Sequence, residues 1–147
     1  MRVSIKQIPD KKAEQVVIEC VEVNEKVERI KSYVTSLGNT LSGTLNNRLF
    51  TFSLYDVYYF EAIDDRVFAY TDSEVYELKT RLYELEHAYT DKGFVRCAKP
   101  TLLNLMAVES LSPGLNGRFI AHMVNKEKII ISRQYVPEIK RILMGGK

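Results

Sequence analysis

The sequence predicts a mainly β, α+β fold: an antiparallel β meander with a terminal helix, preceded by a short β-β-α extension. Three observations predict this class. Short β-prone runs follow one another from residue 41 onward, and turn-forming Asn and Asp pairs separate them. Two further β-prone runs precede residue 24. Apolar residues recur at helical spacing in three segments, namely 24–37, 80–89 and 134–144.

Residues 1–40 form the expected β-β-α extension. The runs 3–8 and 15–23 are rich in β-branched residues, and the turn signal Pro9-Asp10 separates them. Asn24 is the expected N-cap of the first helix, and Gly38-Asn39 is its expected stop. One face of this helix is apolar enough to need a partner surface, since it carries Val27, Ile30, Val34 and Leu37.

Residues 41–147 form the expected main domain, which opens with a meander of antiparallel hairpins. Its β-prone runs are 44–52, 56–63, 66–71 and 74–79. The turn signals within and between them are Asn46-Asn47, Asp64-Asp65 and Asp72-Ser73.

The second half of this domain alternates helical and β-prone segments. Thr80 is the candidate cap of a helix over 80–89 that turns Leu82 and Leu85 inward, and Asp91-Lys92-Gly93 ends it. A β-prone run at 94–97 leads into a segment at 98–105 that we expect to be irregular. Further runs at 108–112, 118–124 and 128–132 precede the last helix, which ends in Gly145-Gly146.

Composition limits the class of protein. The 147 residues suffice for one compact domain, or for one domain with an extension. Cys20 and Cys97 are the two cysteines and form no CxxC pair, so neither a disulfide framework nor a zinc knuckle is expected. No signal-peptide core and no membrane-spanning apolar run is present in the sequence. We expect a reduced, cytoplasmic protein without membrane insertion.

Charge divides the chain in two. Residues 91–147 contain ten Lys or Arg against four acids, a balance of +6, whereas residues 1–90 contain 11 basic and 15 acidic residues, a balance of −4. The formal net charge of +2 therefore hides a basic C-terminal end, which indicates a polyanionic partner for that end.

The segment from about residue 45 to 143 resembles the LytTR family of DNA-binding domains. Three motifs carry the resemblance: the DVYYFE strand at 56–61, the F-x-R-x-x-K-x-x-L-x-N block at 94–104 and the S-R-x-Y-V block at 132–136. The resemblance implies small stacked antiparallel sheets whose loops enter adjacent major grooves, in bacterial transcription regulators. Many members carry a receiver domain, for which the short extension leaves no room, so a role in dimerisation or signal input is expected for residues 1–40.

The resemblance places Lys99, Arg133 and Arg66 where family members contact DNA. Long cations at loop tips suit this task, because Lys and Arg displace counterions from phosphate and Arg binds guanine bidentately. Each residue also has a structural alternative. Arg133 could pair with Glu138 at the helix start, Lys99 could be a solvated loop lysine, and the aspartates at 64 and 65 could neutralise Arg66.

Other residues of the basic end are weighed in the same way. Arg118 and Lys128, near hairpin ends, are candidate phosphate contacts or solvated residues. Arg96 is expected to be structural, and Asn104 to satisfy backbone groups in a turn. The family pattern of His and Ser around the basic residue is replaced here by Ala98 and Pro100, which removes hydrogen-bonding groups and could alter affinity or site preference.

No catalytic site is predicted. Asp64-Asp65 with Glu61 fits a hairpin turn, while His87 and His122 are isolated. Cys97 is expected to pack as a small apolar residue, with a redox-sensing thiol as the alternative. The aromatic cluster is expected in the sheet rather than in base stacking and contains Tyr55, Tyr58, Tyr59 and Phe60. Nucleotide-binding glycine motifs are absent from the sequence, so no cofactor is expected.

Two functions remain open at this point. The first is a sequence-specific regulator that binds double-stranded DNA, with a homodimer expected. The second is an interaction module for a sensor or membrane protein, with only weak nucleic-acid binding. The operator, the input signal and the choice between activation and repression do not follow from the sequence.

Overall fold

A computed structural model describes residues 1–36 and 39–145, and at residues 12, 35 and 36 it describes the backbone alone. The chain divides into two compact units, Met1–Gly38 and Asn39–Lys147. Each unit is described by itself. In the described part of the chain, no helix is long and apolar enough to cross a membrane.

The first unit corrects the expected β-β-α extension. Its helix α1 (Glu25–Ser36) is present, and the Asn24 side chain caps it by accepting a hydrogen bond of 3.0 Å from the Val27 N–H. Residues 1–23, all of them described, contain the 3-10 turn η1 (Lys11–Ala13) but neither predicted strand. These two β-prone runs lack a third strand to pair with, and a lone two-stranded ribbon is at best marginally stable. The predicted stop at Gly38-Asn39 lies partly outside the described residues.

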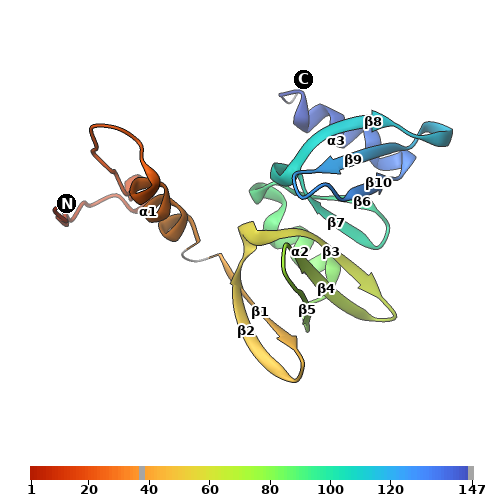
Figure 1. Ribbon diagram of the computed structural model, residues 1–147, viewed down its shortest axis with the longest axis horizontal. Helices are drawn as coiled ribbons and strands as arrows, with labels where there is room; N and C mark the ends of the chain where they lie inside the picture. The colour runs from red at the N-terminus through yellow and green to blue at the C-terminus, as the bar shows by residue number, and fades with distance from the viewer. Residues whose placement is uncertain (37–38, 146–147) are drawn as a thin grey trace. The chain divides into compact units, whose positions relative to one another are not determined.

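The second unit contains a seven-stranded antiparallel sheet in the order β2-β1-β5-β4-β3-β7-β6 (Figure 1). The fold class predicted from the sequence is thereby confirmed. The strands are β1 (Thr40–Leu45), β2 (Arg48–Ser53), β3 (Val57–Ile63), β4 (Arg66–Thr71), β5 (Val75–Leu78), β6 (Phe94–Ala98) and β7 (Thr101–Asn104).

Two of its hairpin turns follow the sequence prediction. Asn46-Asn47 joins β1 to β2, and Asp64-Asp65 joins β3 to β4. All four residues have positive φ between 49° and 65°, a conformation that Asn and Asp tolerate and that tight two-residue hairpins require. The acidic pair is therefore part of a turn, as predicted.

Helix α2 (Leu82–Tyr89) packs on this sheet and closes the first core. It begins after Arg81, whose backbone N–H donates to the Glu84 carboxylate, so the predicted cap Thr80 lies one residue too early. Gly93, with φ of 91°, ends the 3-10 turn η3 (Thr90–Lys92) that follows. The buried core of this part includes Leu54, Phe60, Leu82, Leu85, Phe94 and Leu102.

A three-stranded sheet and helix α3 (Val136–Leu143) build the second core. The strands are β8 (Val108–Pro113), β9 (Phe119–Met123) and β10 (Lys128–Ile131), in the order β10-β9-β8. Buried side chains of both sheets and of α3 meet here, among them Cys97, Leu103, Met123, Ile131 and Ile139. Short 3-10 turns complete the unit: η2 (Leu54–Asp56), η4 (Leu105–Ala107), η5 (Leu115–Gly117) and η6 (Arg133–Tyr135).

The segment at 98–105, expected to be irregular, instead contains strand β7. Lys99-Pro100 is the two-residue turn of a hairpin whose arms are β6 and β7. Residues Thr101–Asn104 are buried on both faces, so their apolar run shows none of the alternation that marks a half-exposed strand. That central position explains why the strand escaped the sequence pattern.

Candidate nucleic-acid interface

Three of the five predicted DNA-contacting residues meet at one hollow of the second unit. Lys99, Arg118 and Arg133 line this hollow of about 450 Å³ together with Asn116, Ser132, Gln134 and Tyr135. None of these residues is acidic. In the part of the chain that the structure describes, the three cations form no ion pair. Their combined charge of +3 is therefore not neutralised by a protein carboxylate there. We call this site the basic hollow.

Strand pairing between distant segments brings these residues together. Lys99 lies in the β6–β7 turn, Arg118 ends the β8–β9 loop, and Arg133 opens η6 directly after β10. The Ser132 N–H donates a 2.7 Å hydrogen bond to the Cys97 carbonyl oxygen. This bond fixes the end of β10 beside β6, so Arg133 and Lys99 come close although 34 positions separate them.

Arg96 supports the Lys99 turn from within the protein. Its Nη1 donates a 2.6 Å hydrogen bond to the Lys99 carbonyl oxygen, and its Nε lies 3.3 Å from Glu86 Oε1 on α2. The Nε atom is buried and makes no hydrogen bond, so the contact with Glu86 is electrostatic. The side chain is 19% exposed. The structural role predicted for Arg96 is thereby confirmed.

The β8–β9 loop supports Arg133 in a similar way. Asn116 and Gly117 have positive φ of 57° and 80°, and the Gly114 N–H closes the loop with a 2.8 Å bond to the Arg118 carbonyl oxygen. A Cβ atom at Gly117 would lie 2.8 Å from Arg133 Cδ, closer than real side-chain contacts allow. Glycine therefore leaves room for the aliphatic stem of Arg133.

The structural alternative for Arg133 is wrong. Glu138 accepts a 3.0 Å hydrogen bond from Nε of Arg141 instead, and the hydrogen bonds from Arg141 lower the pKa of that carboxyl. The Arg133 side chain remains unpaired among the described residues and faces the basic hollow.

Arg66 lies at the same end of the unit but outside the basic hollow. The Ala62 N–H donates a 2.8 Å bond to the Pro100 carbonyl oxygen, which places the β3–β4 and β6–β7 tips side by side. In Figure 1 these two tips and the β8–β9 loop project on one side of the unit. Arg66 is 66% exposed, and its Nη1 lies 4.0 Å from Glu77 rather than pairing with the turn aspartates.

Lys128 lies away from the other four candidates. It begins β10 opposite His122, whereas Ile131 ends the strand opposite Phe119 and leads into Arg133. The strand thus separates Lys128 from the basic hollow.

The remaining sequence predictions for this region concern buried or partnered residues. Asn104 donates to the Val57 carbonyl oxygen at 2.9 Å and accepts from the Met106 N–H at 3.0 Å, so its predicted backbone role is confirmed. Cys97 is fully buried, and burial raises the pKa of its thiol to about 12. Tyr59 is buried and stacks on Tyr70 at 4.4 Å, and Phe60 is fully buried, so these two rings of the aromatic cluster pack within the protein as predicted.

The two histidines lie in different surroundings. His87 is exposed, and the His122 Nε2 lies 2.7 Å from the Ser112 hydroxyl. Within residues 1–36 and 39–145, three or more His, Cys, Asp or Glu side chains nowhere gather as metal ligands would.

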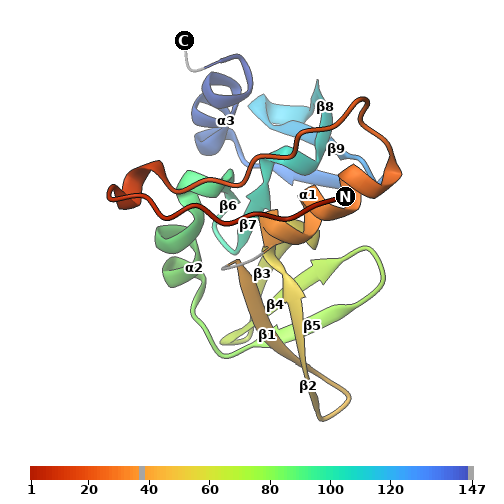
Figure 2. The ribbon, with the colours of Figure 1, turned by 90° about the vertical axis from the view of Figure 1, so that its left-hand side faces the viewer.

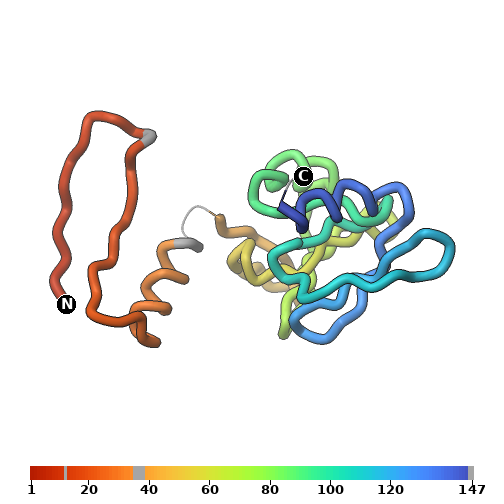
Figure 3. Tube along the Cα trace, turned by 90° about the horizontal axis from the view of Figure 1, so that it is seen from above, coloured from red at the N-terminus to blue at the C-terminus, as the bar shows by residue number. Residues whose placement is uncertain are grey.

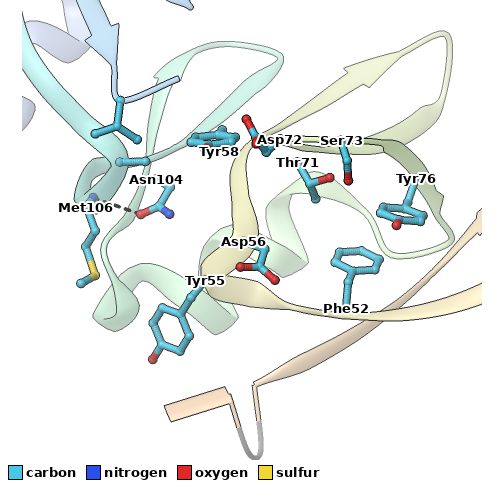
Figure 4. Close-up of a pocket in the computed structure, with 12 residues that line it drawn as sticks. Phe52, Tyr55, Asp56, Tyr58, Thr71, Asp72, Ser73, Tyr76, Asn104 and Met106 are labelled. Carbon is cyan, nitrogen blue, oxygen red and sulfur yellow. Dashed lines mark hydrogen bonds between the residues drawn. The ribbon is translucent and has the colours of Figure 1, made fainter. Parts of the chain in front are cut away.

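A second hollow, of about 460 Å³, has the opposite character. Figure 4 shows Asp56 and Asp72 among aromatic rings that include Tyr55, Tyr58 and Tyr76. Burial, then the charges of Asp72 and Asp56, raise the pKa of the Tyr58 hydroxyl. Asp72 follows the end of β4 that is remote from Arg66. Carboxylates repel phosphate, so the charge of this hollow does not favour nucleic acid.

The sequence prediction missed Asn116 and Gln134, which also line the basic hollow. Asn and Gln amides can pair bidentately with adenine in the major groove. The Asn116-Gly117 doublet could have marked the first, because such a pair is typical of an exposed turn. Gln134 carries no comparable signal beyond its position next to Arg133.

Comparisons with known proteins found a matching family model, similar sequences and a similar fold. The family model described as LytTr DNA-binding domain matches residues 47–144. Uncharacterized HTH-type transcriptional regulators of Staphylococcus aureus strains NCTC 8325 / PS 47 and COL are each 30% identical over 128 residues, 86% of either chain. A solved LytTr DNA-binding domain from Bacillus cereus shares the fold, with a TM-score of 0.66 at 21% identity over 73% of this chain and 97% of that one.

Proposed function

This chain belongs to the LytTR family of DNA-binding domains, and from that premise we propose that it regulates transcription by reading a specific duplex sequence through its loops. One observation carries the proposal: Lys99, Arg118 and Arg133 share one hollow that contains no acid. The three described helices are separated by strands, so consecutive helices of a helix-turn-helix are not available in the described residues. Loops supply the long cations instead.

We assign the roles by chemistry. Arg133 reads a base edge, because a guanidinium binds guanine bidentately, and Asn116 and Gln134 offer amides suited to adenine. Lys99 and Arg118 bind phosphate or a base edge at the rim of the basic hollow. Arg66 contacts flanking phosphate at the same end of the unit, and Lys128 contributes only where the DNA path extends along β10.

Ala98 and Pro100 limit the DNA contacts of the Lys99 turn, because they lack hydrogen-bonding side chains. Neither side chain carries a hydrogen-bonding group, and proline has no N–H. Pro100 instead uses its carbonyl oxygen inside the sheet, where it accepts from Ala62. The ammonium of Lys99 is therefore the one side-chain hydrogen-bonding group among residues 98–100.

Selection from random duplexes followed by anisotropy titration tests this function. We expect the full chain to enrich one sequence, and Arg133→Ala to weaken binding to it by about 1 to 3 kcal/mol while discriminating less between sequences. Lys99→Ala should weaken all sequences and reduce the salt slope by about one unit. Lys126→Ala is the matched control, because Lys126 is an exposed turn lysine in the β9–β10 turn, paired with Glu109 at 3.4 Å.

The outcomes separate the two functions left open by the sequence. Binding unchanged in both Arg133→Ala and Lys99→Ala would show that the basic hollow is not the DNA site. Weak binding of the parent chain, equal for all sequences, would favour a protein-interaction module instead.

A further inference from the structure

The first unit exposes an unusual amount of apolar side chain for its size. Its two extended segments, residues 1–8 (the first arm) and 14–23 (the second arm), are joined through η1, as Figures 2 and 3 show. Seven exposed aliphatic residues lie on the arms: Val3, Ile5, Ile8, Val16, Val17, Val21 and Val23. Among the side chains described in this unit, Val27 alone is buried.

A unit of this size rarely folds without help. Met1–Gly38 is a compact unit of its own, and domains below about 40 residues generally need disulfides, metals or oligomerisation. Its one cysteine, Cys20, is exposed and cannot form an internal disulfide. The described residues also offer no cluster of metal ligands. Oligomerisation is the remaining route.

The charges of the two arms are complementary. The first arm contains Arg2 and Lys6 and no acid, whereas the second contains Glu14, Glu19 and Glu22 and no base. A first arm therefore attracts a second arm and repels another first arm. Two arms of a single chain could form only a two-stranded ribbon with both faces in water, which is marginally stable.

We propose that the first unit is a self-association module, in which the first arm of one chain pairs as a strand with the second arm of another copy. Two such exchanges give four strands related by a two-fold axis, and the two copies of α1 offer apolar residues to cover one face. Ile30 and Val34 of α1 are only half-buried in the single chain, so contact with the strands could bury them further. The pairing also explains why the arms read as strands in the sequence yet form none in a single chain.

The similarity to relatives reaches beyond the second unit. The second unit, Asn39–Lys147, has 109 residues, or about 74% of the chain, whereas the Staphylococcus aureus relatives match 86%. The similarity therefore extends into the first unit. Self-association does not depend on the proposed DNA contacts, because no residue of the basic hollow belongs to the arms.

Sedimentation equilibrium with charge-reversed arms tests the proposal on the full chain. One variant, Arg2→Glu with Lys6→Glu, makes both arms acidic, and the other, Glu19→Lys with Glu22→Lys, gives both arms basic residues. We expect the parent chain to sediment as a dimer, at twice the single-chain mass of 17.0 kDa. Each variant alone should sediment as a monomer. An equimolar mixture of the variants should regain the doubled mass, because each first arm then meets an oppositely charged second arm.

The mixture distinguishes exchange between copies from pairing within a chain. Restored association of the two variants supports the exchange. A mixture that stays monomeric, a parent chain that is monomeric at high micromolar concentration, or a dimer that survives both reversals would each overturn it. Unchanged near-ultraviolet circular dichroism of the tyrosines, which lie mostly in the second unit, checks that the variants are folded there.

Discussion

The Arg96 guanidinium donates a 2.6 Å hydrogen bond to the Lys99 carbonyl oxygen, so a largely buried cation holds the turn that carries an exposed one. Arg96 also lies against Glu86 of α2, at 3.3 Å. The position of the Lys99 ammonium is therefore coupled to the packing of α2 on the sheet. Pre-ordering of a binding loop lowers the entropy cost of association.

Replacing Arg96 should weaken DNA binding without removing a DNA contact. For Arg96→Met we expect a loss of affinity of about five-fold, the equivalent of one hydrogen bond, since the turn must be ordered during binding. The slope of log affinity against log salt should stay as in the parent chain. A slope reduced by about one unit would instead mean that Arg96 binds phosphate directly. The Glu86→Gln variant keeps the hydrogen bond from Arg96 to Lys99, so its DNA affinity should change by less than about two-fold.

Gly117→Ala should disturb Arg133. The φ of 80° costs an alanine about 1 to 2 kcal/mol, and the new Cβ would meet the Arg133 stem. We expect lower stability and about ten-fold weaker binding with reduced discrimination between sequences, measured by thermal unfolding and anisotropy.

Gly93→Ala is the matched control for this change. Gly93 has a similar φ of 91°, but a Cβ added there would approach Met106 and not Arg133. Gly93 also directly precedes β6, at the end of that strand remote from Lys99. Its replacement should lower stability comparably and leave affinity unchanged. Equal losses of affinity in both variants would show that general destabilisation, rather than displacement of Arg133, weakens binding.

Tyr59→Phe should loosen the contact between the two sheets. The Tyr59 hydroxyl on β3 donates a 2.7 Å hydrogen bond to Glu127 next to β10. We expect the free energy of unfolding in urea to fall by about 1.5 to 3 kcal/mol, because the acceptor is charged. Tyr70→Phe is the control, since its 3.1 Å bond to Glu61 stays within one sheet and should contribute less.

The same contact predicts a pH dependence. Burial, followed by the hydrogen bond to Glu127, raises the pKa of Tyr59 above its ordinary value of 10.0. The neutral hydroxyl therefore stabilises the folded state below pH of about 10, and this contribution is lost as the pH rises above that value. The stability difference between the parent chain and Tyr59→Phe should shrink over the same range, and a constant difference would contradict this origin.

Local chemistry explains which parts of the fold the sequence predicted. Asn46-Asn47 and Asp64-Asp65 marked their turns because few other residues tolerate positive φ. The N-cap of α1 could be predicted because the Asn24 side chain bonds to the backbone only three residues further along, at Val27. Strand β7 was missed because its residues are buried on both faces. The arms were predicted as strands because a run of β-branched residues indicates β propensity and not the presence of a pairing partner.

The basic hollow depended on contacts that no local pattern contains. Lys99 and Arg133 meet because the Ser132 N–H bonds to the Cys97 carbonyl oxygen, a relation fixed by sheet packing. Family resemblance supplied these two residues, whereas Asn116 and Gln134 became candidates only from their place in the hollow. Lys128 and Arg118 were predicted on the same ground, a position near a hairpin end. Lys128 nevertheless lies at the end of β10 that is remote from Arg133.

The two cysteines should differ sharply in reactivity. Cys20 is exposed, whereas Cys97 is fully buried, and burial raises the pKa of the Cys97 thiol to about 12, so very little of it is the reactive thiolate near pH 8. At low protein concentration we expect one thiol per folded chain to react rapidly with Ellman's reagent, and two after unfolding in guanidinium. The Cys20→Ser variant should show no rapid phase. A rapid phase in that variant would mean that the second core opens readily and that Cys97 could serve as a redox sensor.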